Sequence, residues 1–415
     1  MFTEKVFHND RYVTSLQAKI ISVEKKNKKT VCITDRTVFY PEGGGQPGDI
    51  GELTLLRDGA PVRTYAVIDT KEEKDGEGVL HILAEEDAAL AVGDTVLLTI
   101  DWENRFINMQ RHAGEHLLTA TIYNRFHGIN KGFHMGSDAV TIDIDLGGEI
   151  MTEAMLTEAE ELANEKIWEN IPINVEYYPN KDEAAKRPSR KPITMDGEIS
   201  LVVFGDYDHP YDCCPCCGTH PNTTGEIGAV HIYKAEPNKG MTRIYFDCGR
   251  RALHHSREEH RILTEVANRY SVAPEKLLAR LEKREEEQRV RNDKLAVFTK
   301  RILALEAEAL QGRVTEDTAL LTASYEDFDT EDVQKLAFTA QELIEKKDLL
   351  LALTHAPSHT LFLVSDGTTP CGDLIKKHAK DFGGKGGGRP EQARARFENT
   401  SGIENFLREI HDKYF

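Results

Sequence analysis

The chain has 415 residues, of which 40% are apolar and 29% charged, and its formal net charge is −18. This length and composition exclude a disordered chain and predict two to four domains with ordinary buried cores. The sequence has neither a long unbroken apolar run nor a basic and then apolar N-terminus, so we expect no membrane span or signal peptide and predict a cytoplasmic location. The negative charge opposes nucleic-acid binding by the surface as a whole, so contact with phosphates requires a local basic patch.

The seven cysteines do not follow a disulfide pattern. Four of them crowd into "DCCPCCGTH", which begins at Asp212, while Cys32, Cys248 and Cys371 are scattered. This distribution indicates reduced thiols, some of which act as metal ligands.

Residues 1–100 contain short alternating apolar runs such as "AKIISV", "TVCITD" and "GDTVLLTID", which predict a small β-barrel or sandwich. Within this region the stretch "FYPEGGGQPGDIG", residues 39–51, is rich in glycine and proline. It lacks the lysine and hydroxyl residue of a Walker loop, and more strand follows where a dinucleotide fingerprint would open a helix. We therefore expect a sharp turn, or a place where another backbone comes close.

Residues 101–255 predict an α+β domain. The segment "DWENRFINMQRHAGEHLLTATIYNRF" has apolar residues at helical spacing. Beyond it we expect the strand "AVTIDIDL", a helix opened by Thr152, and the strands "INVEYYP" and "SLVVFGD".

Residues 256–312 are almost all helix formers, broken once at "SVAPEKLL", where Pro274 suits the first turn of a new helix. Leu281, Leu295 and Ile302 fall at heptad spacing, but Gln288 interrupts the series, so a solvated arm and a dimeric coiled coil are both open. Residues 313–415 return to an α/β pattern with the strand "TLFLVSD", the helix "GDLIKKHAKDF" and a glycine-rich segment. The predicted fold class is therefore an α+β multidomain chain: a small β-barrel, an α+β core, a helical arm and a C-terminal α/β domain.

Two pairs of candidate metal ligands stand out. His112 and His116 lie four residues apart on the predicted helix, so their imidazoles share one face. This pair alone fits structural histidines as well. The second pair, Cys216 and His220, is again four residues apart, and one thiolate with three imidazoles suits tetrahedral zinc.

The identity of the thiolate ligand stays open at this point. Cys213, Cys214 and Cys217 are alternatives, and spacing does not choose between Cys216 and Cys217.

Three motifs resemble a known family. "RHAGEHLL" followed by "CCGTHPNTTGEIG" resembles the HxxxH and CxxxH pairs of the alanyl-tRNA synthetase editing domain and of its free-standing relatives, the AlaX proteins. "FYPEGGGQPGDIG" is similar to the glycine-rich motif of the barrel in the longer AlaX forms, and "GGKGGGRPEQARA" to the signature of the synthetase's C-terminal domain, which DHH-type phosphoesterases share. The order of the motifs matches a long AlaX protein, without the synthetase domain that charges tRNA.

The resemblance implies a division into a barrel with the glycine-rich motif (1–100), a zinc-dependent editing domain (101–255), a helical arm (256–312) and a C-terminal domain of the synthetase and DHH-associated type (313–415). It aligns Cys216 with the family's thiolate ligand and implies one zinc ion per chain, held by His112, His116, Cys216 and His220. The implied activity is hydrolysis of tRNA(Ala) mischarged with serine, and possibly with glycine.

Zinc in such a site activates water or orients the substrate through its amino group. Four protein ligands leave no open position for water, which favours the orienting role, with His220 as the ligand most easily displaced. The "GFHMGSD" segment is expected to cross the pocket, which makes His134 a candidate for specificity or proton handling, with a purely structural role as the alternative.

Two regions are expected to contact tRNA. The first is the glycine loop, which would meet the tRNA end or the editing core through Gly43, Gly44, Gly45 and Gln46. The second is the basic region from Gly372 to Arg396, whose glycine loop could bring amides close to phosphates through Lys385, Gly386, Gly387 and Arg389. A further basic patch is "KRPSRKP" at 186–192. A homodimer through the helical arm or the C-terminal domain is plausible.

Two other functions are alternatives to this hydrolysis. A phosphodiesterase needs a carboxylate-rich two-metal site with a DHH triplet, which the sequence lacks. A non-catalytic tRNA-binding protein with a closed structural zinc site is compatible with every motif.

Overall fold

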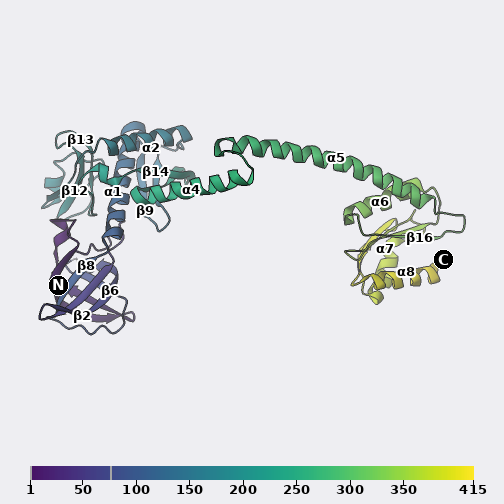
Figure 1. Ribbon diagram of the computed structural model, residues 1–415, viewed down its shortest axis with the longest axis horizontal. Helices are drawn as coiled ribbons and strands as arrows, with labels where there is room; N and C mark the ends of the chain where they lie inside the picture. Colours follow the sequence, from purple (N-terminus) through teal and green to yellow (C-terminus); the bar gives the residue numbers. More distant parts are fainter. Residues whose placement is uncertain (1, 75–76) are drawn as a thin grey trace. The chain divides into compact units, whose positions relative to one another are not determined.

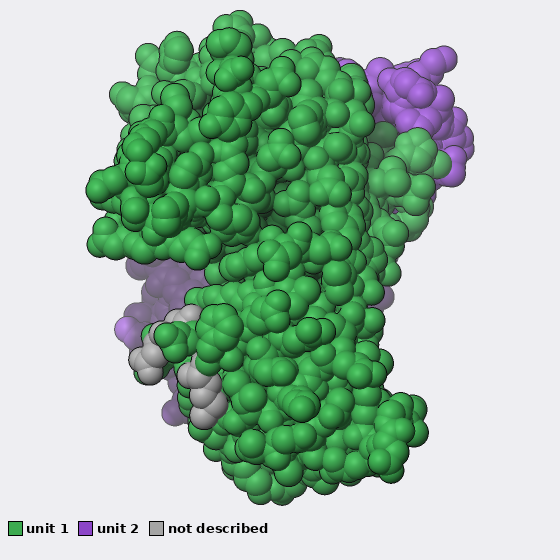
Figure 2. Space-filling view, turned by 90° about the vertical axis from the view of Figure 1, so that its left-hand side faces the viewer, with its two compact units in different colours: residues 1–265 green, residues 266–415 purple. Residues whose placement is uncertain are grey.

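A computed structural model describes residues 2–74 and 77–415 (Figure 1). The chain forms two compact units, residues 1–265 and residues 266–415. Unit 1 contains a β-barrel and an α/β part, and Figure 2 shows its surface narrowing between these two lobes. None of the helices in the described ranges is long and apolar enough to cross a bilayer.

The N-terminal lobe is a closed barrel of six antiparallel strands in the order β2-β3-β7-β6-β5-β8, which confirms the predicted small barrel. Alternate side chains point inward and form a core that includes Ile20, Leu53, Tyr65 and Leu98. A short parallel pair, β1 with β4, adjoins the barrel. The elements are β1 (Glu4–Lys5), η1 (Val6–His8), β2 (Ser15–Lys26), β3 (Lys29–Thr34), β4 (Arg36–Thr37), β5 (Gly51–Arg57), β6 (Ala60–Glu72), β7 (Val79–Leu83) and β8 (Thr95–Ile100).

Helix α1 (Trp102–Phe126) follows the last barrel strand, as predicted. The carboxylate of Asp101 caps its N-terminus by accepting from the amide of Asn104, and it ends at His127, whose φ is 60°. From Asn108 to Ile122 the helix is buried on every side. Polar residues of its middle turns are therefore enclosed in the protein, and a functional site can form inside the fold.

Two antiparallel sheets and further helices surround α1. One sheet has the order β14-β15-β10-β9, and the other has the order β11-β12-β13. Their apolar faces share one core with α1 and α2, which Thr152 caps as predicted. The elements are β9 (Ile129–Met135), β10 (Val140–Asp145), α2 (Glu153–Trp168), β11 (Ile173–Tyr178), α3 (Lys181–Ala184), β12 (Ile199–Gly205), β13 (Pro210–Pro215), η2 (Thr224–Ile227), β14 (Val230–Asn238), β15 (Met241–Cys248) and α4 (Gly249–Arg269).

Unit 2 has a five-stranded sheet in the order β16-β17-β18-β20-β19, in which only β16 and β17 are parallel. Both faces are covered, because Leu351 packs in a core with α5 and α6, while its neighbour Leu350 packs in a second core with α7 and α8. The elements are η3 (Pro274–Lys276), α5 (Leu277–Gln311), β16 (Leu320–Tyr325), α6 (Thr330–Leu343), β17 (Leu350–His355), β18 (Thr360–Val364), α7 (Cys371–His378), η4 (Ala379–Phe382), β19 (Lys385–Gly388), β20 (Gln392–Arg396) and α8 (Thr400–Tyr414).

The glycine-rich segment of unit 2 is a strand, which corrects the expected loop. Residues Lys385 to Gly388 form β19, an exposed edge strand paired with β20. A Cβ on Gly386 would lie 2.1 Å from the carbonyl oxygen of Arg394, and one on Gly388 would lie 2.2 Å from that of Gln392. The glycines here permit two strands to approach closely. A phosphate-binding loop is also rich in glycine, so the sequence alone does not distinguish the two structures.

Candidate metal centre

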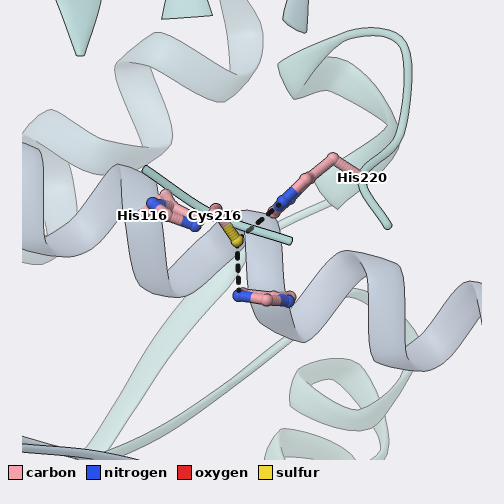
Figure 3. Close-up of side chains that lie close together, drawn as sticks. His116, Cys216 and His220 are labelled. Atoms are coloured by element: carbon pink, nitrogen blue, oxygen red, sulfur yellow. Dashed lines mark hydrogen bonds between the residues drawn. The ribbon is translucent and has the colours of Figure 1, made fainter. Parts of the chain in front are cut away.

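Four side chains converge inside unit 1. The ligand atoms of His112, His116, Cys216 and His220 all lie within 4.8 Å of one another. The Sγ of Cys216 lies 3.3 Å from the Nε2 of His112 and 3.4 Å from the Nε2 of His220 (Figure 3). The rings of His112 and His116 stack with centroids 5.2 Å apart, as their spacing of one helical turn predicts.

None of the three alternative cysteines, Cys213, Cys214 and Cys217, belongs to the described group of possible metal ligands. Cys213 packs in a small apolar core with β12 and α3. Cys217 is exposed, and its Sγ lies 4.0 Å from the hydroxyl of Tyr40. Among the described residues, Cys216 is thus the thiol that the structure groups with the three histidines.

The residues fit a metal ion. Both ring nitrogens of His116 and the Nδ1 of His220 are buried without a hydrogen-bond partner among the described residues. Buried polar atoms are rarely left unpaired, because each lost partner costs about 1–3 kcal/mol. The Nε2 atoms of His112 and His220 both face the Sγ of Cys216. A cation bound by these atoms and by one ring nitrogen of His116 would satisfy that unpaired nitrogen, and this donor set suits a tetrahedral ion.

Burial sets the charge of the cluster. It lowers the pKa of His112 to about 3, with a smaller contribution from Lys191. It also lowers the pKa of His116 and of His220 well below the ordinary value, so the three rings are neutral and keep lone pairs for a metal. Burial raises the pKa of the Cys216 thiol, an effect that a bound cation would oppose by stabilising the thiolate.

Gln46 of the glycine-rich loop fixes the orientation of His112. Its side chain is fully buried, and its Oε1 lies 3.0 Å from the Nδ1 of His112 and accepts from the amide of Thr219 at 3.0 Å. Its Nε2 donates to the hydroxyl of Thr219 at 2.8 Å. Because Oε1 can only accept, the Nδ1 of His112 carries the proton and the Nε2 presents its lone pair to the cluster.

The glycine-rich loop packs on the four-residue cluster. Gly44 and Gly45 have φ values of 58° and 82°, and a Cβ on Gly45 would lie 2.6 Å from the ring of Phe133. The ring of Phe133 in turn stacks on His112 with centroids 5.5 Å apart. Loop, phenyl ring and imidazole therefore form three successive layers.

A buried ion pair joins the same loop to α1. The Nε of Arg105 donates to both carboxylate oxygens of Asp49 at 2.8 Å, and its Nη2 donates to the carbonyl of Val38 at 2.7 Å. Asp49 also accepts from the amide of Tyr40 at 2.7 Å. Arg105 lies two turns before His112 on α1, so the barrel and the helix that bears the histidines are held together.

A second set of polar groups lies behind His116. Its Nδ1 is 3.9 Å from a carboxylate oxygen of Glu115 and 4.0 Å from one of Asp212. Arg190 binds Asp212 with two hydrogen bonds of 2.7 and 2.9 Å, and Asn130 donates to Glu115 at 2.7 Å. From the sequence, Arg190 was only part of a basic patch. Its ion pair with Asp212 was not predicted, because the pattern of charged residues does not reveal a buried partner.

The remaining predicted site residues lie elsewhere. His134 is exposed, and strand alternation places it on the opposite face of β9 from Phe133, so it is not part of the four-residue cluster. Lys385, Gly386 and Gly387 of β19, and Arg389 beyond it, are all exposed in unit 2.

Comparison with known proteins identifies related families. Two family models match, "tRNA synthetases class II (A)" at residues 6–104 and "Threonyl and Alanyl tRNA synthetase second additional domain" at residues 199–245. Among solved structures, the C-Ala domain from Aquifex aeolicus alanyl-tRNA synthetase matches 24% of this chain and 94% of its own at 16% identity, with a TM-score of 0.21, a likeness too distant to carry an argument.

Two curated relatives match along the chain. The alanine–tRNA ligase of Methanobrevibacter smithii is 29% identical over 93% of this chain, which spans 43% of the ligase. The alanyl-tRNA editing protein AlaX-L of Pyrococcus horikoshii is 30% identical over 403 residues, which cover 95% of each protein. From this match along nearly its whole length, the chain belongs to the AlaX-L family of alanyl-tRNA editing proteins.

Proposed function

We propose that the protein hydrolyses the ester bond of tRNA(Ala) mischarged with serine, and secondarily with glycine, and that it uses one zinc ion held by His112, His116, Cys216 and His220. The observation that carries the proposal is the convergence of these four side chains, with buried and unpaired ring nitrogens, in a chain of the AlaX-L family. When bound, zinc would supply a positive charge that can hold the amino group of the amino acid or polarise water.

The chain's own residues prepare the site for this chemistry. Gln46 fixes the tautomer of His112, and Phe133 with the glycine loop covers that ring, which limits access of bulk water. His220 has no partner for its Nδ1, whereas His112 is held by Gln46. His116 also has no partner for either ring nitrogen, so this difference separates both histidines from His112. Of the two we propose His220, which a loop rather than α1 carries, as the ligand displaced when substrate binds.

The proposed tRNA contacts use separate surfaces. In unit 1 the exposed backbone of Gly44 and Gly45 would meet the acceptor end. In unit 2 the exposed edge strand β19 with Lys385 and Arg389 would contact phosphates, which would make affinity fall steeply with added salt.

A homodimer through the helical arm is part of the same proposal. Three apolar side chains of α5, Leu295, Val297 and Phe298, are 60–67% exposed, which supports an interface there. A molar mass that stays that of a monomer at every protein concentration would dismiss this part.

The deciding experiment is deacylation of Ser-tRNA(Ala), Gly-tRNA(Ala) and Ala-tRNA(Ala) by the zinc-loaded protein, with His116→Ala in parallel. We expect rapid loss of the seryl ester, sparing of the alanyl ester, and no activity in the variant, whose circular dichroism should match that of the original protein. Failure to hydrolyse any of the three esters would reject the proposal.

One observation favours the non-catalytic alternative, a tRNA-binding protein with a structural zinc ion. The three histidines are at most 3% exposed, as in a closed structural site. Removal of zinc by a chelator distinguishes the two functions. The editing proposal expects lost hydrolysis with secondary structure largely kept, because a large apolar core surrounds the cluster, whereas a structural ion predicts that the α/β part unfolds.

A further inference from the structure

A groove of about 570 Å³ lies in unit 1 between α2 and β14, and none of the four candidate metal ligands lines it. Figure 1 shows these two elements side by side. Among the described residues, β14 pairs with β15 alone and ends the sheet β14-β15-β10-β9, so one of its edges has no partner strand. An open strand edge beside a helix is a place where an extended peptide can add as a further strand.

Side chains of α2 already cover the first part of this edge. Asn164 accepts from the amide of Val230 and donates to its carbonyl, each at 2.9 Å. Glu160, one turn earlier on α2, accepts from the amide of Ile232. These contacts occupy the outward backbone groups at the start of β14, so a further strand cannot pair there.

The second part of the edge keeps its outward groups free. A turn of two residues, 239 and 240, with φ values of 51° and 79°, joins β14 to β15. Because hydrogen-bonded and non-hydrogen-bonded pairs alternate from such a turn, Ala235 directs its N–H and C=O away from β15. Pro237 has the same orientation, which suits a residue without an N–H. Within the described ranges neither residue forms a hydrogen bond outside the ladder with β15.

The groove combines free negative charge with an apolar floor. Glu153 and Glu161 are exposed on α2, and neither side chain has a hydrogen-bond or ion-pair partner in the part of the chain that the structure describes. Lys234 also lines the groove, but its ammonium lies 3.2 Å from the carboxylate of Glu236. Leu156 lies between the two free carboxylates in the sequence and packs on the apolar core. The groove therefore repels phosphates and complements a chain with basic and apolar side chains.

We propose that this groove binds an extended, basic segment of another protein, which adds to β14 as a short strand. The segment's backbone bonds to Ala235 and to the carbonyl of Pro237, and one of its faces packs on Leu156. Glu153 and Glu161 are about 12 Å apart along the helix axis, and side chains four residues apart on a strand are separated by about 13 Å. Two basic side chains at this spacing meet both carboxylates. The interaction is independent of the proposed hydrolysis.

The test is fluorescence anisotropy of the zinc-loaded full chain with the labelled peptide GKVLVKG, whose lysines are four residues apart and share a face with the leucine. Glu153→Lys and Glu161→Lys should each weaken binding about fivefold, because an attraction becomes a repulsion. Glu165→Lys, at an exposed position of α2 outside the groove, is the matched control and should bind as the original protein does. Equal affinities of the three variants, or no binding by the original protein, would overturn the proposal.

Strand addition itself is tested through the backbone. Ala235→Pro removes the outward N–H and keeps the ladder with β15, since Pro237 already occupies an equivalent position, and it should weaken binding about tenfold. N-methylation of the peptide at its leucine or at the next valine blocks opposite edges of the peptide without changing the protein. One of these two peptides should bind about tenfold more weakly than the other. If Ala235→Pro binds the peptide normally and both N-methylated peptides bind as the original peptide does, strand addition is rejected.

Discussion

Gln46 and His112 are 66 residues apart in the chain, yet the Oε1 of one lies 3.0 Å from the Nδ1 of the other. The contact connects the glycine-rich loop to the face of α1 that carries His112 and His116. It shows that the loop acts on the cluster through a side-chain amide, while its glycines permit the close approach that the amide needs.

Gln46→Leu should therefore weaken zinc binding, because His112 loses the acceptor that selects its tautomer. Loss of such an outer partner typically costs 10- to 100-fold in metal affinity, so we expect a decrease of about tenfold or more. Competition with a chromophoric chelator measures it. Gln17→Leu, at an exposed position of β2, should bind zinc as the original protein does. Equal affinities of the two variants would show that the Gln46 contact does not support the ligand.

The ion pair between Arg105 and Asp49 predicts a large stability effect. Both side chains are buried, so Arg105→Met leaves the carboxylate of Asp49 without its partner and should lower the free energy of unfolding by about 4 kcal/mol. Adding Asp49→Leu removes the orphaned charge and should recover part of this loss. Urea unfolding of the two variants measures it, and a double variant no more stable than Arg105→Met would contradict the argument.

The sequence identified the pairs that the structure brings together but not what supports them. Each pair can be recognised in the sequence because its two members are four residues apart. His112 and His116 lie on one helix, and Cys216 and His220 lie in one loop. Gln46 was expected to meet the tRNA end or the α+β core. Its contact with His112 was not predicted, because that residue belongs to a distant segment. The residues adjacent in sequence to Arg105 and Asp49 give no sign that these charges are buried. Both are buried only because the barrel packs against α1 at this point.

Strand register explains another difference. In "GFHMGSD" the histidine, His134, was predicted to act in the site. Because side chains alternate along β9, Phe133 faces His112 and His134 faces outward. A shift of one residue would exchange the two roles, and an isolated sequence does not fix that register. The small barrel and the long helices were easier to predict, because their strands and helices have clear periodicities.

His81 predicts how barrel stability depends on pH. Burial lowers its pKa to about 4 from an ordinary value of 6.5. Between these values the unfolded chain binds a proton that the folded chain does not, so the free energy of unfolding should fall by about 3 kcal/mol as the pH drops from 6.5 to 4. His81→Gln should flatten this dependence, while His411→Gln, exposed on α8, should leave it unchanged. Urea titrations at several pH values provide the measurement, and an equal slope in both variants would exclude His81 as its source.

Gly218 offers a steric test of the cluster. Its φ is not in the left-handed region, so the backbone alone would accept alanine. The added Cβ, however, would lie 2.2 Å from the Cε1 of His112 and 3.0 Å from the Oε1 of Gln46, and must displace one of them. We expect Gly218→Ala to lose zinc affinity by about tenfold or more, because a ligand or its orienting partner moves.

Gly387→Ala is the matched control for this substitution. Gly387 also lacks a positive φ, and no atom lies within 4 Å of its added Cβ, so this variant should keep the zinc affinity of the original protein. Zinc content after dialysis and the chelator competition give two independent readings. If Gly218→Ala retains zinc as well as Gly387→Ala does, the contact between the Cys216 loop and His112 is not what holds that imidazole in place.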